Sequence, residues 1–233
     1  MASSEFNASN NVASGTNIGV DQMEVTGIIL AGGKSLRLGR NKATEIIGGM
    51  TLIERVIKSL TVVTNRIILV TAGDIGSISA IHSVEEINDI YPGKGPLSGI
   101  YTGLRSSHTI SNIVVACDMP FLNTELLEHM VRLLPGFDAI VPRWPNGFIE
   151  PLYAAYSISC LTTMKKHLDN KQLTINGCLK EMHVSHLDKN EFSKFDPDFL
   201  SFFNINNQAD IDFANKLAAS QKMEGKVVCA PPR

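Results

Sequence analysis

Residues 25–42 read VTGIILAGGKSLRLGRNK, and the two halves of this stretch differ sharply in character. Val25–Leu30 is a continuous apolar run of strand length, which is typical of a strand buried on both faces of a sheet. The run ends in the tight loop Ala31-Gly32-Gly33, and cations follow at Lys34, Arg37, Arg40 and Lys42. Glycines let the backbone approach a phosphate chain, and cations balance its charge. The stretch therefore predicts a buried strand followed by a phosphate-binding loop.

Two familiar phosphate-binding motifs do not fit this loop. A Walker A loop needs a glycine five residues before Gly33, in front of Lys34-Ser35, but Ile28 stands there. A dinucleotide fingerprint needs G-x-G-x-x-G after the strand, and residues 31–39 do not contain it. A plain strand–helix turn with solvated cations remains the alternative to a phosphate site.

Beyond this loop, apolar strands alternate with amphipathic helices. We expect strands at 66–71, 84–88, 112–117 and 138–141, and helices at 51–60, 75–83, 97–107 and 123–134. Thr51 and Glu54 have the spacing of a capping box, and Asn123 is placed to cap the last of these helices. The alternation predicts an α/β fold, namely a Rossmann-like, doubly wound and mostly parallel sheet. The second half is less regular, with helices expected near 157–167 and 207–217.

Composition suggests one folded domain between two loose ends. Residues 1–22 are rich in Ser, Asn and Gly, so we expect a disordered leader, a domain over 23–218 and a flexible tail over 219–233. The net charge is −2, and basic runs and bilayer-length apolar runs are absent, which argues against nucleic acid and membrane as partners. The four cysteines form no CxxC pair, and reduced thiols in a cytoplasmic protein are the expectation.

Three unusual loops should meet at one edge of the sheet. In open α/β sheets, ligands bind beyond the carboxyl ends of the strands, where loops 30–42, 89–99 and 118–121 all belong. Asp118 follows a buried strand and suits Mg²⁺, which takes one or two carboxylates together with phosphate oxygens. The alternative to a metal ligand is that Asp118 caps the next helix. Gly95–Gly99 begins a helix whose free N–H groups can bind a base edge or an anion. Asp89 can accept hydrogen bonds from a guanine or a ribose, or it can be an ordinary turn residue.

The motifs together resemble one enzyme family. The pattern Leu30-Ala31-Gly32-Gly33-x-Ser35-x-Arg37-x-Gly39-x-x-Lys42 is similar to the signature of the molybdenum cofactor guanylyltransferases (MobA), within the nucleotide-diphospho-sugar transferase type of fold. The further matches follow in the family's order over residues 24–218, at Gly95-Pro96-Leu97-Ser98-Gly99, Cys117-Asp118-Met119-Pro120-Phe121, Glu150-Pro151-Leu152-Tyr153 and Phe203-Asn204-Ile205-Asn206-Asn207. The chain departs from the family at Asn41, where Asp is usual, and at Thr71, where Asn is frequent.

The resemblance implies an activity and a set of roles. Such an enzyme would transfer GMP from GTP with Mg²⁺ to the terminal phosphate of a molybdopterin-type cofactor, and cofactor-delivering or cofactor-accepting proteins would contact it transiently. Arg37, Lys42 and Asp118 would be catalytic, and Asp118 would hold the metal. The nucleotide would lie against Leu30, Ala31, Gly32, Gly33, Lys42, Thr71, Asp89, Gly95, Pro96, Leu97, Ser98, Gly99 and Asp118.

The second substrate is the least determined part of this interpretation. Arg143, Glu150 and Asn204 are the candidates for its pocket, and Trp144 would either flank a pterin or cover apolar surface. The alternatives to the guanylyltransferase activity are a related nucleotidyltransferase that uses CTP or another phosphorylated acceptor, and a nucleotide-binding module without catalysis.

Overall fold

The computed structural model of the 233-residue chain describes residues 24–31, 42–72 and 84–227, with side chains up to 220. Its strands are β1 Val25–Ala31, β2 Ile46–Ile47, β3 Met50–Thr51, β4 Arg66–Thr71, β5 Glu85–Asn88, β6 Ser111–Ala116, β7 Ala139–Arg143, β8 Tyr153–Ser157 and β9 Val184–Asp188. Its helices are α1 Leu52–Val63, α3 Pro96–Ser106, α4 Thr124–Leu133, α5 Cys160–Asp169, α6 Ile175–Leu179, α7 Lys189–Phe192 and α8 Gln208–Val227. Short 3₁₀ turns cover Lys42–Thr44 and Leu200–Phe202.

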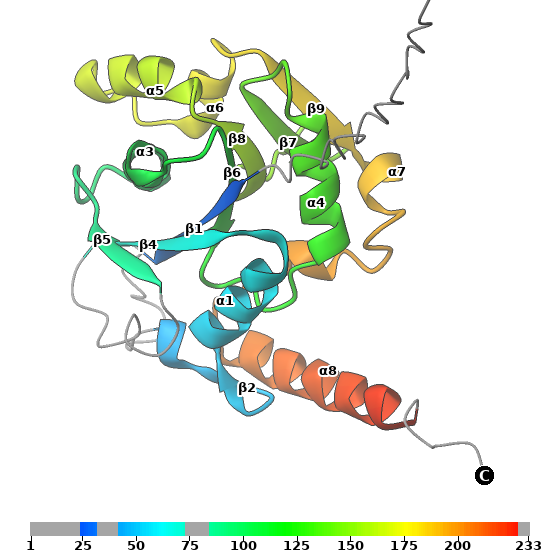
Figure 1. The fold of residues 1–233 in the computed structure, drawn as a ribbon. Helices are drawn as coiled ribbons and strands as arrows, with labels where there is room; N and C mark the ends of the chain where they lie inside the picture. The colour runs from blue at the N-terminus through cyan, green and yellow to red at the C-terminus, as the bar shows by residue number, and fades with distance from the viewer. Residues whose placement is uncertain (1–23, 32–41, 73–83, 228–233) are drawn as a thin grey trace, which may run out of the picture.

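Seven of the strands form one mixed sheet between two layers of helices. The strand order is β5-β4-β1-β6-β8-β7-β9. All neighbouring pairs are parallel except the two that β8 makes, with β6 and with β7. Helices α1 and α4 cover one face, and α3 and α5 cover the other (Figure 1). The predicted α/β fold with a doubly wound, mostly parallel sheet is confirmed.

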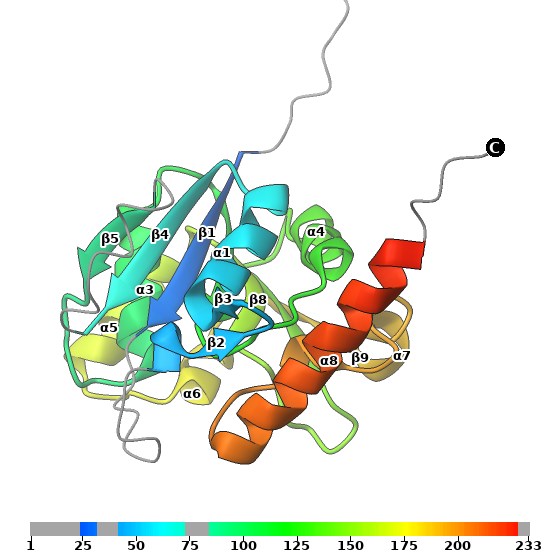
Figure 2. The same cartoon turned by 90° about the horizontal axis from the view of Figure 1, so that it is seen from below.

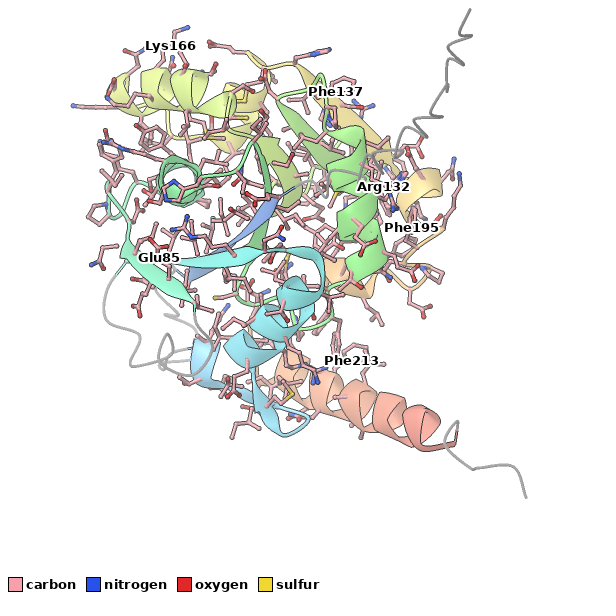
Figure 3. All side chains as sticks on the ribbon, viewed as in Figure 1. Glu85, Arg132, Phe137, Lys166, Phe195 and Phe213 are labelled. Atoms are coloured by element: carbon pink, nitrogen blue, oxygen red, sulfur yellow. The ribbon has the colours of Figure 1, made fainter. Side chains whose placement is uncertain are left out.

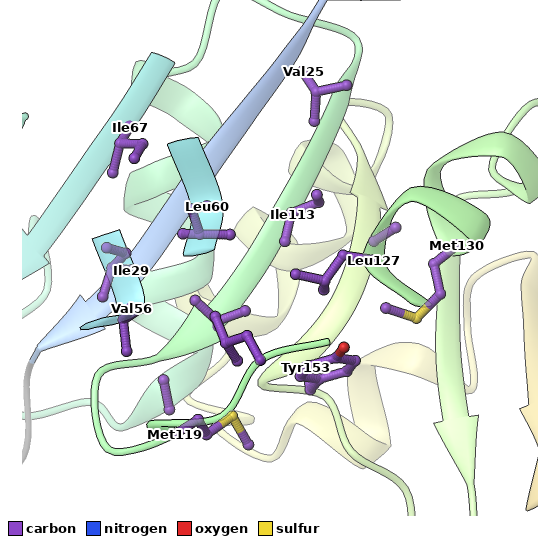
Figure 4. Close-up of a cluster of buried hydrophobic side chains, with 14 of the residues drawn as sticks. Val25, Ile29, Val56, Leu60, Ile67, Ile113, Met119, Leu127, Met130 and Tyr153 are labelled. Carbon is purple, nitrogen blue, oxygen red and sulfur yellow. The ribbon is translucent and has the colours of Figure 1, made fainter. Parts of the chain in front are cut away.

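The apolar residues of the central strands alternate between two cores, because successive side chains of a strand point to opposite faces. In β1, Ile29 packs with α1 and α4, whereas Ile28 packs with α3 and α5. Figure 4 shows the first of these cores, where Val56 and Leu60 of α1 meet Ile29 and Ile113 of the sheet. Burial on both faces explains why the strand sequences read as continuous apolar runs.

Helix α3 lies unusually close to β1. A Cβ atom at Gly103 would stand 2.3 Å from Cγ2 of Ile28, and one at Gly99 would stand 3.2 Å from Cδ2 of Leu30. Glycine at these two positions, one helical turn apart, therefore lets the helix backbone rest on the strand. The approach fixes the start of α3 against the carboxyl end of β1, which is also where the predicted phosphate-binding loop begins.

The capping signals are confirmed. The Thr51 hydroxyl accepts from the Glu54 N–H while the Glu54 carboxylate accepts from the Thr51 N–H, so the capping box starts α1. The Asn123 side chain accepts from the Leu126 N–H at the start of α4. The predicted strand 66–71 is confirmed with both of its ends.

A small module forms on the outer side of α1. The hairpin β2–β3 and helix α8 pack around Ile47, Leu52, Ile205, Ile211 and Ala214. In Figure 2, helix α8 passes below the β2–β3 hairpin. Figure 3 labels Phe213, a residue of α8, below α1. The helix continues to Val227, so the domain boundary predicted at 218 falls inside it. Good helix formers such as Ala218, Gln221 and Met223 account for the continuation.

The other predictions at the ends and in one helix lie outside the described residues. These are the leader 1–22, the helix 75–83 and the last residues of the tail. Of the helices in the part of the chain that the structure describes, none is long and apolar enough to cross a membrane.

Candidate active site

A cavity of about 510 Å³ opens at the carboxyl ends of β1, β4 and β6. The strand ends supply Leu30 and Ala31 of β1, Thr71 of β4 and Ala116 of β6. The full lining comprises Leu30, Ala31, Lys42, Ala43, Val70, Thr71, Asp89, Gly95, Pro96, Gly99, Ala116, Cys117, Asp118, Met119, Phe148, Glu150, Pro151, Leu152, Ile175, Asn204 and Asn206. The three loops that the sequence assigned to one crevice do contribute to it, through their described residues.

The floor of the cavity holds an interacting trio of polar side chains. The Nζ of Lys42 lies 3.7 Å from Oδ2 of Asp118 and donates a hydrogen bond to Oδ1 of Asn206 at 3.1 Å. The N–H of Ile205 donates to the backbone carbonyl of Asp118 at 3.0 Å, which joins the two segments. Residues separated by more than 160 positions in the chain thus converge on one ammonium group.

Asp118 is a carboxylate with little solvation. Burial raises the pKa of Asp118, while the positive charge of Lys42 acts in the opposite direction. Lys42 is the only cation among the described residues that line the cavity, whereas Asp89, Asp118 and Glu150 are all acidic. A triphosphate therefore needs additional positive charge there.

The donor set around Asp118 fits a metal that arrives with phosphate. The described residues contain no cluster of three or more His, Cys, Asp or Glu side chains that could cage an ion. Mg²⁺ commonly uses one or two carboxylates and completes its shell with phosphate oxygens and water. A single desolvated carboxylate beside a lysine matches this mode of binding.

The neighbouring thiol is not a nucleophile. Burial raises the pKa of Cys117 to about 12, and the charge of Asp118 acts in the same direction. The thiol is therefore protonated at neutral pH, and a thiolate is the reactive form of cysteine.

Asp89 organises the loop that leads into α3. Its Oδ1 accepts from the Tyr91 N–H at 3.0 Å and from the Thr102 hydroxyl at 2.9 Å, and its Oδ2 accepts from the Ser98 hydroxyl at 2.7 Å. The loop turns into the helix at Gly95, which has φ +80 and begins the helix with no side-chain cap. Pro96 has no N–H and the Ser98 N–H donates to the Gly95 carbonyl at 3.2 Å, so the first turn of α3 keeps few backbone donors for a ligand.

The opposite end of the cavity is built from the segment that enters β8. Because β8 runs antiparallel to β6, its beginning lies at the carboxyl end of β6, and the Ala116 N–H donates to the Leu152 carbonyl at 3.1 Å. Glu150 and Phe148 reach the cavity from this segment. Burial raises the pKa of Glu150, and the hydrogen bond from Trp144 acts in the opposite direction.

The structure brings most of the predicted residues together. Leu30, Ala31, Lys42, Thr71, Asp89, Gly95, Pro96, Gly99, Asp118, Glu150 and Asn204 line the cavity. Leu97 and Ser98 belong to the same helix start but are fully buried beneath it. Arg143 stands apart, in a separate depression beside Trp144 and Lys189. Gly32, Gly33 and Arg37 lie outside the described residues.

The sequence prediction did not include several lining residues. Asn206, Phe148 and Ile175 face the cavity although no role was assigned to them. Asn206 could have been found, because it lies within the motif Phe203–Asn207 that carried part of the resemblance. Phe148 follows the turn residues Pro145-Asn146-Gly147, where an aromatic side chain is weak but usable evidence of a binding surface.

Comparison with known protein families identifies the family of this chain. The family described as the MobA-like NTP transferase domain matches residues 27–183, which contain most of the cavity. The chain belongs to this family. It is therefore an enzyme of the nucleotidyltransferase class.

Curated relatives match over most of the chain. A probable molybdenum cofactor guanylyltransferase of Peptoclostridium acidaminophilum is 31% identical over 210 residues, which cover 86% of this chain and 92% of the relative. The molybdenum cofactor guanylyltransferase of Desulfosudis oleivorans is 33% identical over 194 residues, which cover 82% and 94%.

Solved structures show the same fold. Molybdopterin-guanine dinucleotide biosynthesis protein A from Archaeoglobus fulgidus superposes with a TM-score of 0.73 at 29% identity, over 84% of this chain and 99% of that one. A 2-C-methyl-D-erythritol 4-phosphate cytidylyltransferase from Thermus thermophilus superposes with a TM-score of 0.64 at 15% identity, over 84% and 100%. The second likeness concerns the fold alone.

Proposed function

We propose that this enzyme transfers GMP from GTP to the terminal phosphate of a molybdopterin-type molybdenum cofactor. The main support is the trio of Lys42, Asp118 and Asn206 at the carboxyl ends of the parallel strands, in a cavity of about 510 Å³. The names of the curated relatives agree with this acceptor and this nucleotide.

The reaction needs no covalent intermediate on the protein. A phosphate oxygen of the acceptor forms a bond to the α-phosphorus of GTP, the bond from that phosphorus to the bridging oxygen breaks, and pyrophosphate leaves. Catalysis of this kind depends on alignment of the two phosphates and on stabilisation of their negative charge. Lys42 balances charge on the phosphates, and Asn206 keeps its ammonium group in place.

Asp118 is the residue that would hold Mg²⁺, and the ion would neutralise charge on the triphosphate. The carboxylate is fixed by its neighbours, since its backbone carbonyl accepts from Ile205 and Lys42 faces its side chain. We assign Arg37 to the same charge-balancing role, by the resemblance of the motif in which it stands.

The nucleotide lies on the α3 side of the cavity in this proposal. In this proposal the loop Gly95–Gly99 donates a backbone N–H to the O6 atom of guanine, where adenine carries an amino group. An unpaired buried polar group costs about 1–3 kcal/mol, so GTP should bind roughly tenfold or more tightly than ATP. Asp89 supports this loop with three hydrogen bonds, so Asp89→Ala should weaken both nucleotides rather than narrow the gap between them.

Pyrophosphate release with each of the four nucleoside triphosphates and the molybdenum cofactor tests the proposal. GTP should give release that depends on the cofactor. A preference for CTP would move the enzyme to the cytidylyl branch, and no release with any of the four would favour a binding module without catalysis. CTP is included in the assay because a cytidylyltransferase has the same fold.

Asp118→Asn tests the metal role. The variant should fold, because burial already disfavours the charged carboxylate at this position, yet it should lose most turnover, since a neutral amide is a poor ligand for Mg²⁺. The exposed Asp198 offers a matched control, and Asp198→Asn should leave turnover unchanged. Near-normal turnover of Asp118→Asn at limiting Mg²⁺ would contradict the assignment.

We also propose that the enzyme works in the cytoplasm and meets cofactor-delivering or cofactor-accepting proteins transiently. Both follow from the proposed substrate. Co-purification with and without bound cofactor measures such contacts.

A further inference from the structure

The β8 end of the cavity contains a carboxylate with unused capacity to accept hydrogen bonds. Oε1 of Glu150 accepts from the indole Nε1 of Trp144 at 2.8 Å. Oε2 accepts no hydrogen bond from the residues that the structure describes, and Glu150 forms no ion pair with them. Lys42 and Asp118 are the charged groups of the phosphate-binding trio in the same cavity, and neither pairs with it. Because Glu150 lines the cavity, its free Oε2 atom can accept a hydrogen bond from a bound ligand.

Trp144 holds that carboxylate on a rigid base. Its ring meets Phe192, Phe199 and Phe202 edge to face, with centroids 5.1, 5.2 and 5.4 Å away. The backbone N–H of Glu150 donates to the Pro142 carbonyl at 3.0 Å. Trp144 therefore acts in positioning Glu150, and its place in an aromatic cluster shows that it packs against the protein rather than facing a ligand.

An exposed aromatic ring, two residues earlier in the chain, lines the same cavity as this carboxylate. Phe148 lines the cavity with 58% of its surface exposed. Its backbone is fixed, since the Trp144 N–H donates to the Phe148 carbonyl at 2.8 Å and Gly147 closes the turn with φ +84. Ile175 and Leu152 add apolar surface to the same cavity. A flat ligand can stack on such a surface while its edge reaches the carboxylate.

We propose that Glu150 and Phe148 select the acceptor by recognising its pterin ring. The pyrimidinone edge of a pterin carries a ring N–H beside an exocyclic amino group, and both would donate to the Glu150 carboxylate. Phe148 covers the face of the ring. Such charge-assisted bonds are strong and directional, and one of them would use the Oε2 atom that accepts no hydrogen bond from the described residues. The inference rests on the proposed function for its choice of acceptor.

Trp144 provides a direct measurement because it is the only tryptophan of the chain. We would titrate the wild-type enzyme with 7,8-dihydroneopterin monophosphate, a reduced pterin with a terminal phosphate, and follow the tryptophan emission. The expected result is saturable quenching. Glu150→Gln should weaken this binding about tenfold or more, because the amide presents N–H groups to the donors of the ring. Phe148→Leu, which keeps apolar area but removes the ring, should also weaken it.

Controls separate pterin recognition from general damage and from nucleotide recognition. Glu125→Gln changes an exposed carboxylate in the first turn of α4 and should leave pterin binding unchanged. Calorimetric titration with GTP should give the same affinity for wild type, Glu150→Gln and Phe148→Leu. With the molybdenum cofactor as acceptor, Glu150→Gln should raise KM for the acceptor and leave KM for GTP unchanged.

The outcomes are distinguishable from those of the proposed function. Absence of saturable quenching in the wild type would overturn the pterin subsite, whatever the pyrophosphate assay shows. Weaker GTP binding with unchanged pterin binding in Glu150→Gln would also overturn it and assign Glu150 to the guanine base, whose edge has the same donors. Saturable pterin binding that depends on Glu150, without transfer to the cofactor, would retain the subsite and reject the proposed reaction.

Discussion

Gly103→Ala tests the close approach of α3 to β1. The new Cβ would stand 2.3 Å from Cγ2 of Ile28 and 3.1 Å from its Cδ1. Ile28 is fully buried, and its branched side chain has little rotational freedom. Alanine favours a helix interior over glycine by about 1 kcal/mol, but overpacking a core costs about 1–3 kcal/mol. With the contact this short we take the upper end, so the free energy of unfolding should fall by about 2 kcal/mol.

For a chain of this length, that loss corresponds to roughly 4–8 °C in melting temperature, which thermal denaturation followed by circular dichroism measures. Gly99→Ala is the matched control one turn earlier. Its Cβ would meet the flexible end of Leu30 at 3.2 Å, so it should gain helix propensity and lose little to packing. Adding Ile28→Ala to Gly103→Ala should cost less than the sum of the two single changes. A Gly103→Ala variant that melts at or above the wild-type temperature would refute the reasoning.

Three further predictions concern a cap, a titrating group and the trio. Thr51→Ala removes one half of the capping box and should lower the stability by about 1 kcal/mol in chemical denaturation, and an unchanged midpoint would show that α1 does not need the cap. Burial raises the pKa of Glu150 in the folded protein above its pKa in the unfolded chain. Protonation of Glu150 therefore contributes fully to stability below the unfolded-state pKa, and this contribution is lost as pH rises through the folded-state pKa. Glu150→Gln should therefore reduce the pH dependence of the free energy of unfolding between these two pKa values. The same slope in the variant and the wild type would contradict a raised pKa for Glu150. Asn206→Ala removes the side chain that accepts a hydrogen bond from Lys42, and it should reduce turnover more than it reduces GTP affinity. Unchanged single-turnover rates would show that this hydrogen bond is dispensable.

Local signals in the sequence were sufficient to predict much of the part of the cavity that β1, β6 and the start of α3 form. The apolar run before Ala31 and the turn at Asp118 each mark the end of a buried strand, and parallel strands bring such ends to one edge. Thr51 and Asn123 identify their helix starts because capping depends on residues three positions apart. These features are short in range, and a single sequence displays them directly.

The other side of the site depends on long-range geometry. The run Tyr153–Ser157 was not predicted as a strand, and nothing in its composition shows that it enters the sheet antiparallel between β6 and β7. That direction is what carries Glu150 to the cavity. Glu150 and Asn204 were therefore found through motifs of the family resemblance, whereas Arg143, which stands outside those motifs, lies in another depression.

The reversed direction of β8 also bears on how such an enzyme can change its acceptor. Strands β1, β4 and β6 with the start of α3 come from residues before 120, whereas the Glu150 end is assembled from later segments that approach through a strand of opposite polarity. On the proposed assignment, substitutions in the loop before β8 would alter the acceptor end of the cavity without moving β1, β4 or β6. Exchanging residues 144–152 between members of this family is accordingly the direct way to ask whether a new acceptor can be taken while the nucleotide end stays unchanged.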